Sequence, residues 1–188
     1  MKRAAPPREP PLRATRRAAS LVIVNTGDGK GKSTAAFGTA LRAIARGWKV
    51  CVVQFIKSDR WKVGERDSAI RLGVEWWTLG DGFTWDSQSM ERTEAVAREA
   101  WRVARDKIAS GEYQLVVLDE ITYPINWGWI PAAEVVSAIA ARPASVNVIA
   151  TGRDAPSELV DIADTVTEMR NRKHAFDAGI RAIRGIDF

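Results

Sequence analysis

The chain has 188 residues, of which 46% are hydrophobic and 27% charged, the composition of a globular protein rather than of a disordered or fibrous one. It contains no apolar run of the roughly 20 residues that cross a bilayer, and its basic, proline-rich start lacks the apolar centre of a secretory signal. A single cysteine, Cys51, excludes an internal disulfide. We therefore expect a cytoplasmic protein without a membrane partner.

The net charge of +5 is unevenly distributed along the chain. Residues 1–19 hold six basic residues and one acidic residue, and the rest of the chain holds 22 of each sign. We expect residues 1–19 to be a flexible basic arm and residues 20–188 to form one domain. A neutral body gives little electrostatic support for binding nucleic acid.

Short apolar runs alternate with helical patterns from residue 20 onward. Short β-branched and apolar runs predict strands over 21–25, 49–56, 73–79, 113–120, 145–152 and 164–169, of which 21–25 and 145–152 are expected to be buried. Helical spacing predicts helices from Lys32 to Gly47, over 89–111 with Ser89 as the cap, from Pro131 to before Pro143, and over 156–163. Buried strands separated by helices indicate an α/β fold, a parallel sheet covered by helices on both faces.

The first predicted strand runs directly into the sequence TGDGKGKST, Thr26 to Thr34. The phosphate-loop spacing G-x-x-x-x-G-K-[ST] is met except at its first position, where Thr26 replaces glycine. Strand, glycine loop and helix follow in the order that a phosphate cradle needs. We expect ATP to be bound by the loop and the start of the helix, at Gly27, Asp28, Gly29, Lys30, Gly31, Lys32, Ser33 and Thr34.

A pair of carboxylates ends the most apolar predicted strand, LVVLDE. Asp119 and Glu120 resemble the Walker B position, where a carboxylate meets the magnesium ion held by the loop. Ser33, Asp119 and Glu120 are therefore the candidate ligands of Mg²⁺ or Mn²⁺. Since successive strand residues face opposite ways, one carboxylate should face the metal and the other support it.

Several further residues have two readings. Arg42, Thr151 and Arg153 could contact phosphate or ribose at the carboxyl edge of the sheet, or could form ordinary ion pairs and caps. His174, the only histidine, is expected to be structural. Trp127 and Trp129 are expected beside the site or at a subunit contact.

Seven segments together carry a family resemblance, and they follow one another in order from Leu21 to Phe188. They read VNTGDGKGKSTAAFGTALRA, VVQFIKS, GVEWWTLGDGFTW, VVLDEITY, VIATGRDAP, ADTVTEMR and KHAFDAGIRAIRGIDF. This set is similar to the corrinoid adenosyltransferase family of cobalamin biosynthesis and salvage, which has a P-loop (RecA-like) fold. Related chains often carry a longer helical arm at the N-terminus, whereas the prolines here exclude a continuous helix from the first residue.

The resemblance implies transfer of the 5′-deoxyadenosyl group of ATP to the Co(I) of a reduced corrinoid, with release of triphosphate. It also implies a homodimer, and a reduced flavin or flavodoxin as electron donor. Phe83 and Trp85 match family aromatics that lie against the lower face of the corrin and exclude an axial cobalt ligand. Read alone, these two aromatics would be assigned to the core. With Lys32, they are the expected catalytic residues.

Two other functions fit the residues taken by themselves. A phosphate-loop kinase of small molecules would use Asp119 or Glu120 as the base for an acceptor hydroxyl. A RecA-like, ATP-driven nucleic-acid binder would need a basic surface on the folded body, which is neutral.

Overall fold

The computed structural model describes residues 17–57, 64–79 and 87–187. Its centre is a sheet of six parallel strands in the order β3-β2-β4-β5-β1-β6. The strands are β1 (Val22–Thr26), β2 (Val50–Phe55), β3 (Glu75–Leu79), β4 (Leu115–Asp119), β5 (Asn147–Thr151) and β6 (Thr165–Glu168). The P-loop-like α/β architecture predicted from the sequence is confirmed.

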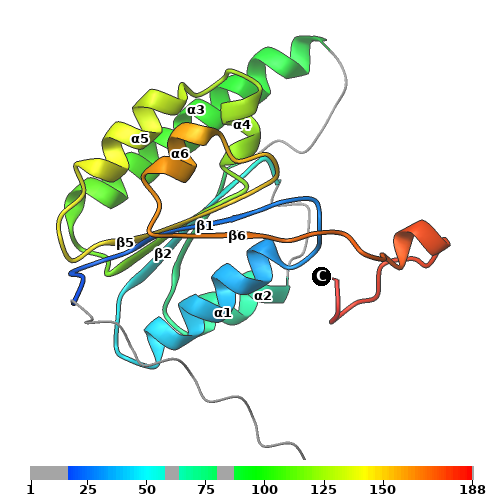
Figure 1. Cartoon of the computed structure of the whole chain (residues 1–188), viewed down its shortest axis with the longest axis horizontal. Coiled ribbons are helices and arrows are strands. Elements are labelled where there is room, and N and C mark those ends of the chain that lie inside the picture. The colour runs from blue at the N-terminus through cyan, green and yellow to red at the C-terminus, as the bar shows by residue number, and fades with distance from the viewer. Residues whose placement is uncertain (1–16, 58–63, 80–86, 188) are drawn as a thin grey trace, which may run out of the picture.

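Helices cover both faces of this sheet (Figure 1). One face carries α1 (Lys32–Ile44) and α2 (Gly64–Arg71). The other carries α3 (Ser87–Ser110), α4 (Thr122–Asn126), α5 (Ala132–Ala140) and α6 (Ser157–Asp161). A short 3-10 helix, η1 (Phe176–Ala178), lies in the C-terminal segment. None of the helices in the described ranges is both long and apolar enough to span a membrane.

The buried strands divide their side chains between two cores. Along β2, Val50 and Val52 pack in the core under α1, whereas Cys51, Val53 and Phe55 pack in the core under α3. Both faces are therefore apolar, which explains why the sequence of β2 shows no alternation. Burial raises the pKa of the Cys51 thiol to about 12, so this cysteine is an inert core residue.

Some local predictions were wrong. Helix α3 begins at Ser87, so Ser89 lies inside the helix and does not cap it. Pro131 is the N-cap of α5 and not a residue of its first turn. Helices α2 and α4 were not predicted. Helix α2 has no buried residue and α4 has only five residues, so neither gives an apolar periodicity to read.

The carboxyl ends of the strands lie at one edge of the sheet, as they must in a parallel sheet. In Figure 1 the C-terminal segment leaves β6 and lies beyond this edge, near the start of α1. The loops that follow β1, β2, β4 and β5 meet here, at the edge where open α/β sheets bind ligands.

Candidate nucleotide and metal site

The glycine loop joins β1 to α1 over residues 27–31. Gly31 precedes the helix with a φ of 116°, a left-handed conformation that glycine adopts without steric cost. No side-chain hydrogen bond from the described residues caps α1. The backbone N–H groups of its first turn are therefore available to an anion.

Lys32 folds back across the loop. Its Nζ donates hydrogen bonds to the carbonyl oxygens of Gly27 at 2.6 Å and Gly29 at 2.8 Å. Burial, followed by the nearby charge of Arg153, lowers the pKa of Lys32. Its ammonium is thus held over the concave side of the loop, where a bound phosphate would replace the carbonyl contacts.

Thr26, the residue that departs from the phosphate-loop spacing, ties the loop to two neighbouring segments. Its Oγ1 accepts a hydrogen bond from the N–H of Ala155 at 3.1 Å, and its carbonyl oxygen accepts one from the N–H of Met169 at 2.8 Å. A glycine here would keep the second bond and lose the first. The threonine therefore gives the start of the loop an extra anchor on the chain that follows β5.

The chain that leaves β6 passes directly against the glycine loop. The N–H of Gly29 donates to the carbonyl of Met169 at 2.6 Å. A Cβ atom on Gly27 or Gly29 would lie 2.5 Å or 2.8 Å from that same oxygen, well inside van der Waals contact. Both glycines are therefore required by packing within the protein.

The two carboxylates at the end of β4 have different surroundings. Asp119 is fully buried and accepts hydrogen bonds from Nε2 of Gln54 and Oγ1 of Thr151, each at 2.8 Å. Glu120 has a φ of 66°, and this left-handed conformation turns the chain at the end of the strand. Its N–H donates to Oγ1 of Thr151 at 2.9 Å. Thr151 thus links the two acidic residues.

The pKa of Glu120 is shifted by its surroundings. Burial, followed by the charge of Asp119, raises the pKa of Glu120 to about 7. The ammonium of Lys57 acts in the opposite sense, and it lies 3.6 Å from Oε1 of Glu120 and 3.9 Å from Oδ2 of Asp119. A second cation at this place would lower the pKa of Glu120 further and hold it ionised.

Lys32, Lys57 and Glu120 line a polar cavity of about 420 Å³. Its walls come from the glycine loop, the start of α1, the ends of β2 and β4, and the C-terminal segment. The charged members of the lining are Asp28, Lys30, Lys32, Lys57, Glu65, Glu120, Arg153, Asp177 and Asp187. The mixture of both signs suits a ligand that carries phosphates together with a metal cation.

An apolar cavity of about 520 Å³ adjoins the polar one. The two share Thr34, Phe37 and Glu65 in their linings. Phe37 and Trp76 stand in its wall with ring centroids 5.1 Å apart. A phosphate cradle beside an aromatic, apolar cavity is the arrangement that a nucleotide requires.

Comparisons with known proteins agree with this geometry. The profile of the family described as ATP:corrinoid adenosyltransferase BtuR/CobO/CobP matches residues 18–188. The chain belongs to this family. It is 48% identical over 168 residues to the corrinoid adenosyltransferase of Escherichia coli K12, covering 89% of this chain and 85% of that one.

Two further relatives have similar identities. The corrinoid adenosyltransferase CobA of Salmonella typhimurium is 47% identical over 168 residues, with 89% and 85% of the two chains covered. The corrinoid adenosyltransferase of Pseudomonas aeruginosa PAO1 is 44% identical over 170 residues, with 89% and 83% covered. The resemblance predicted from the seven sequence segments is thereby confirmed.

Within this adenosyltransferase, the residues predicted for ATP fall into two groups. Residues Asp28 to Thr34 and Arg153 line the polar cavity. Gly27 and Arg42 are absent from the lining of both cavities, and Arg42 lies in the last turn of α1. Thr151 is fully buried and binds Asp119 and the Glu120 backbone, so it supports the site from behind.

The metal candidates divide in the same way. Ser33 and Glu120 line the polar cavity, whereas Asp119 does not. The described residues contain no cluster of three or more His, Cys, Asp or Glu side chains that could hold a metal by themselves. A site with few protein ligands suits magnesium, which is usually held by one or two protein oxygens together with phosphates and water.

The other residues singled out from the sequence are two aromatics, one histidine and two tryptophans. Phe83 and Trp85 lie outside the described residues. His174 lines the polar cavity, and its Nδ1 accepts the N–H of Phe176 at 3.1 Å. Trp127 packs between two aromatic rings, with centroids 5.6 Å from Tyr123 and 4.7 Å from Trp129.

Lys57, Gln54 and Asp187 were missed by sequence reasoning. Lys57 follows a buried strand just as Glu120 does, so the rule applied to β4 would also have found it on β2. Gln54 is fully buried beside Asp119, which its place in an apolar run could not reveal. No sequence signal indicated that Asp187 would pair with Lys30.

Proposed function

We propose that this protein transfers the 5′-deoxyadenosyl group of ATP to the Co(I) ion of a reduced corrinoid. A Co–C5′ bond forms while the C5′–O5′ bond breaks, and its electron pair leaves on the oxygen of triphosphate. The observation that carries the proposal is a polar cavity that shares three lining residues with an apolar one, in a chain that belongs to the corrinoid adenosyltransferase family.

The protein's part in this reaction is to bind, orient and neutralise. Reduced cobalt is a strong nucleophile, so no general base is required. The loop N–H groups and the Lys32 ammonium would hold the triphosphate and stabilise the charge that develops as it leaves. Arg153 stands in the same wall and would add a second positive charge.

We further propose Ser33 and Glu120 as the protein ligands of Mg²⁺ or Mn²⁺. Their hydroxyl and carboxylate oxygens are the hard donors that these ions prefer. Asp119, held by Gln54 and Thr151, would position Glu120 rather than bind the metal. When bound, the ion would neutralise phosphate charge.

The apolar cavity would bind the adenine base of the nucleotide. Phe37, Trp76 and the aliphatic side chains of α1 offer the flat, apolar contacts that a purine base needs. Thr34 stands where the two cavities meet. A nucleotide with its triphosphate at the loop and its base in this cavity would use both.

Further proposals rest on the family resemblance. Phe83 and Trp85 would exclude an axial ligand from cobalt, which raises the reduction potential of the Co(II) state. The electron donor would be a reduced flavin or flavodoxin, the active species a homodimer and the compartment the cytoplasm. Size-exclusion chromatography with light scattering tests the dimer.

Anaerobic incubation with ATP, Mg²⁺ and chemically reduced cobalamin tests the reaction. We expect a light-sensitive alkylcobalt spectrum and one triphosphate per alkylcobalt. Production of ADP would instead indicate a kinase, and phosphate release stimulated by DNA would indicate a nucleic-acid motor. Either product in place of triphosphate would overturn the proposal.

A further inference from the structure

Lys57 reaches the acidic residues through a strained turn at the end of β2. The N–H of Lys57 donates to the carbonyl of Phe55 at 2.7 Å, which closes a three-residue turn around Ile56. Ile56 has a φ of 68°, a left-handed conformation that β-branched residues rarely adopt. Such strain persists only where the surrounding structure holds it in place, and it is concentrated at functional sites.

Glu120, the ion-pair partner of Lys57, also lies at a left-handed turn directly after a strand. Glu120 follows β4 with a φ of 66°, and β2 and β4 are paired so that Gln54 lies opposite Asp119. Two adjacent strands therefore end in left-handed residues that turn a lysine and a glutamate toward each other. Both side chains line the polar cavity.

The ammonium of Lys57 forms long ion pairs with two carboxylates rather than one short hydrogen bond with either. Its distances of 3.6 Å to Glu120 and 3.9 Å to Asp119 exceed those of an ordinary hydrogen bond. Asp119 is fully buried, and only about a quarter of the Lys57 side chain is exposed. Together with Lys32, this positive charge offsets the repulsion between two closely spaced acids.

We propose that Lys57 is an exchangeable counter-ion of the metal site, and this rests on the proposed role of Glu120 as a metal ligand. Lys57 neutralises Asp119 and Glu120 in the empty site, and is displaced from them when the metal binds. Its ammonium then pairs with the triphosphate. The flexible four-carbon stem of lysine allows the exchange, and Lys57 already shares the cavity wall with Lys32.

This exchange makes the site selective for a metal–nucleotide complex over the metal alone. A free divalent ion must displace Lys57 from its two nearest carboxylates, leaves it only the weaker attraction of Glu65 in the same cavity wall, and brings no anionic partner in exchange. A metal that arrives with a triphosphate brings that partner with it. Removing the lysine charge should therefore strengthen binding of the bare metal and weaken binding of the metal–nucleotide complex.

Nucleotide-free Mn²⁺ binding measures the first effect directly. Lys57→Met should bind Mn²⁺ at least about tenfold more tightly than the wild type, because a cation no longer opposes the ion. Its dissociation constant for Mn²⁺–ATP should rise at least about tenfold. Lys57→Arg keeps the charge and should stay near the wild type for bare Mn²⁺. Lys49→Met, at the exposed opposite end of β2, is the matched control and should change neither constant.

The unfolding temperature, measured with and without Mn²⁺, distinguishes a change in metal binding from a folding defect. Mn²⁺ should raise the unfolding temperature of Lys57→Met more than that of the wild type. Bare-metal affinity in Lys57→Met equal to or weaker than the wild type would overturn the proposal. A Glu120→Gln variant separates this failure from that of the metal site itself. If it still binds Mn²⁺ as the wild type does, the assignment of Glu120 is wrong and the counter-ion proposal falls with it.

Discussion

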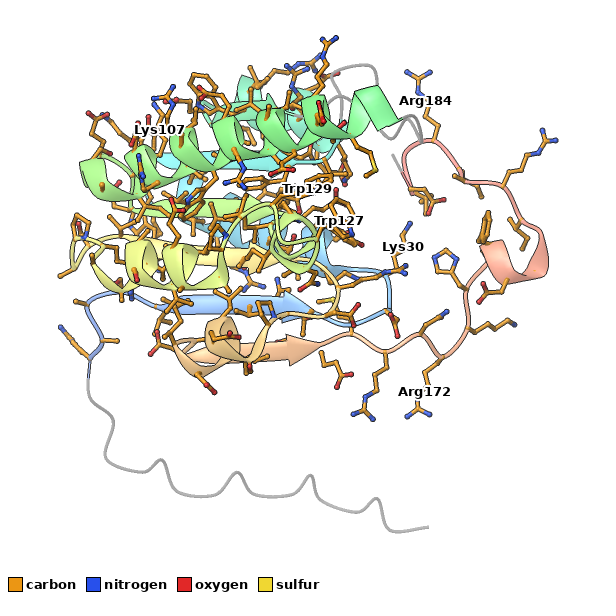
Figure 2. The ribbon with its side chains drawn as sticks, turned by 90° about the horizontal axis from the view of Figure 1, so that it is seen from above. Lys30, Lys107, Trp127, Trp129, Arg172 and Arg184 are labelled. Carbon is orange, nitrogen blue, oxygen red and sulfur yellow. The ribbon has the colours of Figure 1, made fainter. Side chains whose placement is uncertain are left out.

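Lys30 of the glycine loop forms an ion pair with Asp187, 157 residues later in the chain. Figure 2 shows Lys30 facing the C-terminal segment, whose Arg172 and Arg184 point outward. Asp187 also accepts the N–H of Ile183 at 2.7 Å, and this bond first and Lys30 second lower the pKa of Asp187. The segment that lines the polar cavity is thus fastened to the loop that would hold phosphate.

Breaking that ion pair should loosen the segment without unfolding the domain. Asp187→Asn keeps an acceptor for Ile183 and removes the charge. We expect faster amide hydrogen exchange over residues 171–187, a severalfold higher KM for ATP and little change in unfolding temperature, because the pair is at the surface. Lys30→Ala should speed exchange as much as Asp187→Asn does, and the double variant should add nothing further, because either change breaks the same ion pair. Unchanged exchange in Asp187→Asn would show that the ion pair does not hold the segment.

Replacing Lys32 by alanine should abolish use of ATP. The ammonium is held over the loop by two carbonyl groups, whereas Lys57 and Arg153 line the cavity from the loops after β2 and β5. We expect a loss of at least about 100-fold in kcat/KM for ATP, with a normal far-ultraviolet dichroism spectrum. Full activity in this variant would remove the loop from the mechanism.

The raised pKa of Glu120 predicts a pH dependence of metal binding. Because Mn²⁺ binds the ionised carboxylate, its affinity in the absence of nucleotide should rise about tenfold per pH unit below pH 7 and level off above it. Glu120→Gln should bind weakly at every pH. Wild-type affinity that does not change between pH 5.5 and 7 would contradict the assignment.

The same group has an opposite effect on stability. Between its ordinary pKa of 4.5 and about 7, Glu120 holds a proton in the folded protein that the unfolded chain releases. Its contribution to the free energy of unfolding therefore falls as pH rises through this window. Urea denaturation at pH 5 and 7.5 should show a larger decrease for the metal-free wild type than for Glu120→Gln. An equal decrease in both would contradict the raised pKa.

The two aromatics of the GFTW sequence should matter chiefly for cobalt reduction. Phe83→Ala and Trp85→Ala should lower turnover from cob(II)alamin, with a reductant present, far more than turnover from chemically reduced cob(I)alamin. Anaerobic assays from the two starting states make the comparison. Equal losses in both assays would assign these residues to the fold alone.

The sequence predicted those parts of the molecule that depend on local patterns. The run LVVLDE predicted both a core strand and the acids at its end, and GDGKGKS predicted the loop that joins β1 to α1. Contacts between segments that are distant in the chain have no local sequence pattern that would predict them. The bond from Ala155 to Thr26, the pairing of Lys57 with Glu120 and that of Lys30 with Asp187 depend on which strands become neighbours and where the chain returns after β6. Helix α2 was not predicted because it has no buried residue and therefore no apolar face that the sequence could show.

The central claim is that the reaction occurs at C5′ of ATP and not at phosphorus. ATP labelled with ¹⁸O at the O5′ position, incubated with reduced cobalamin and Mg²⁺, tests it directly by mass spectrometry of the products. Cleavage of the C5′–O5′ bond predicts that all of the label appears in triphosphate. Label retained in adenosine, AMP or ADP would show attack at a phosphorus atom and contradict the claim.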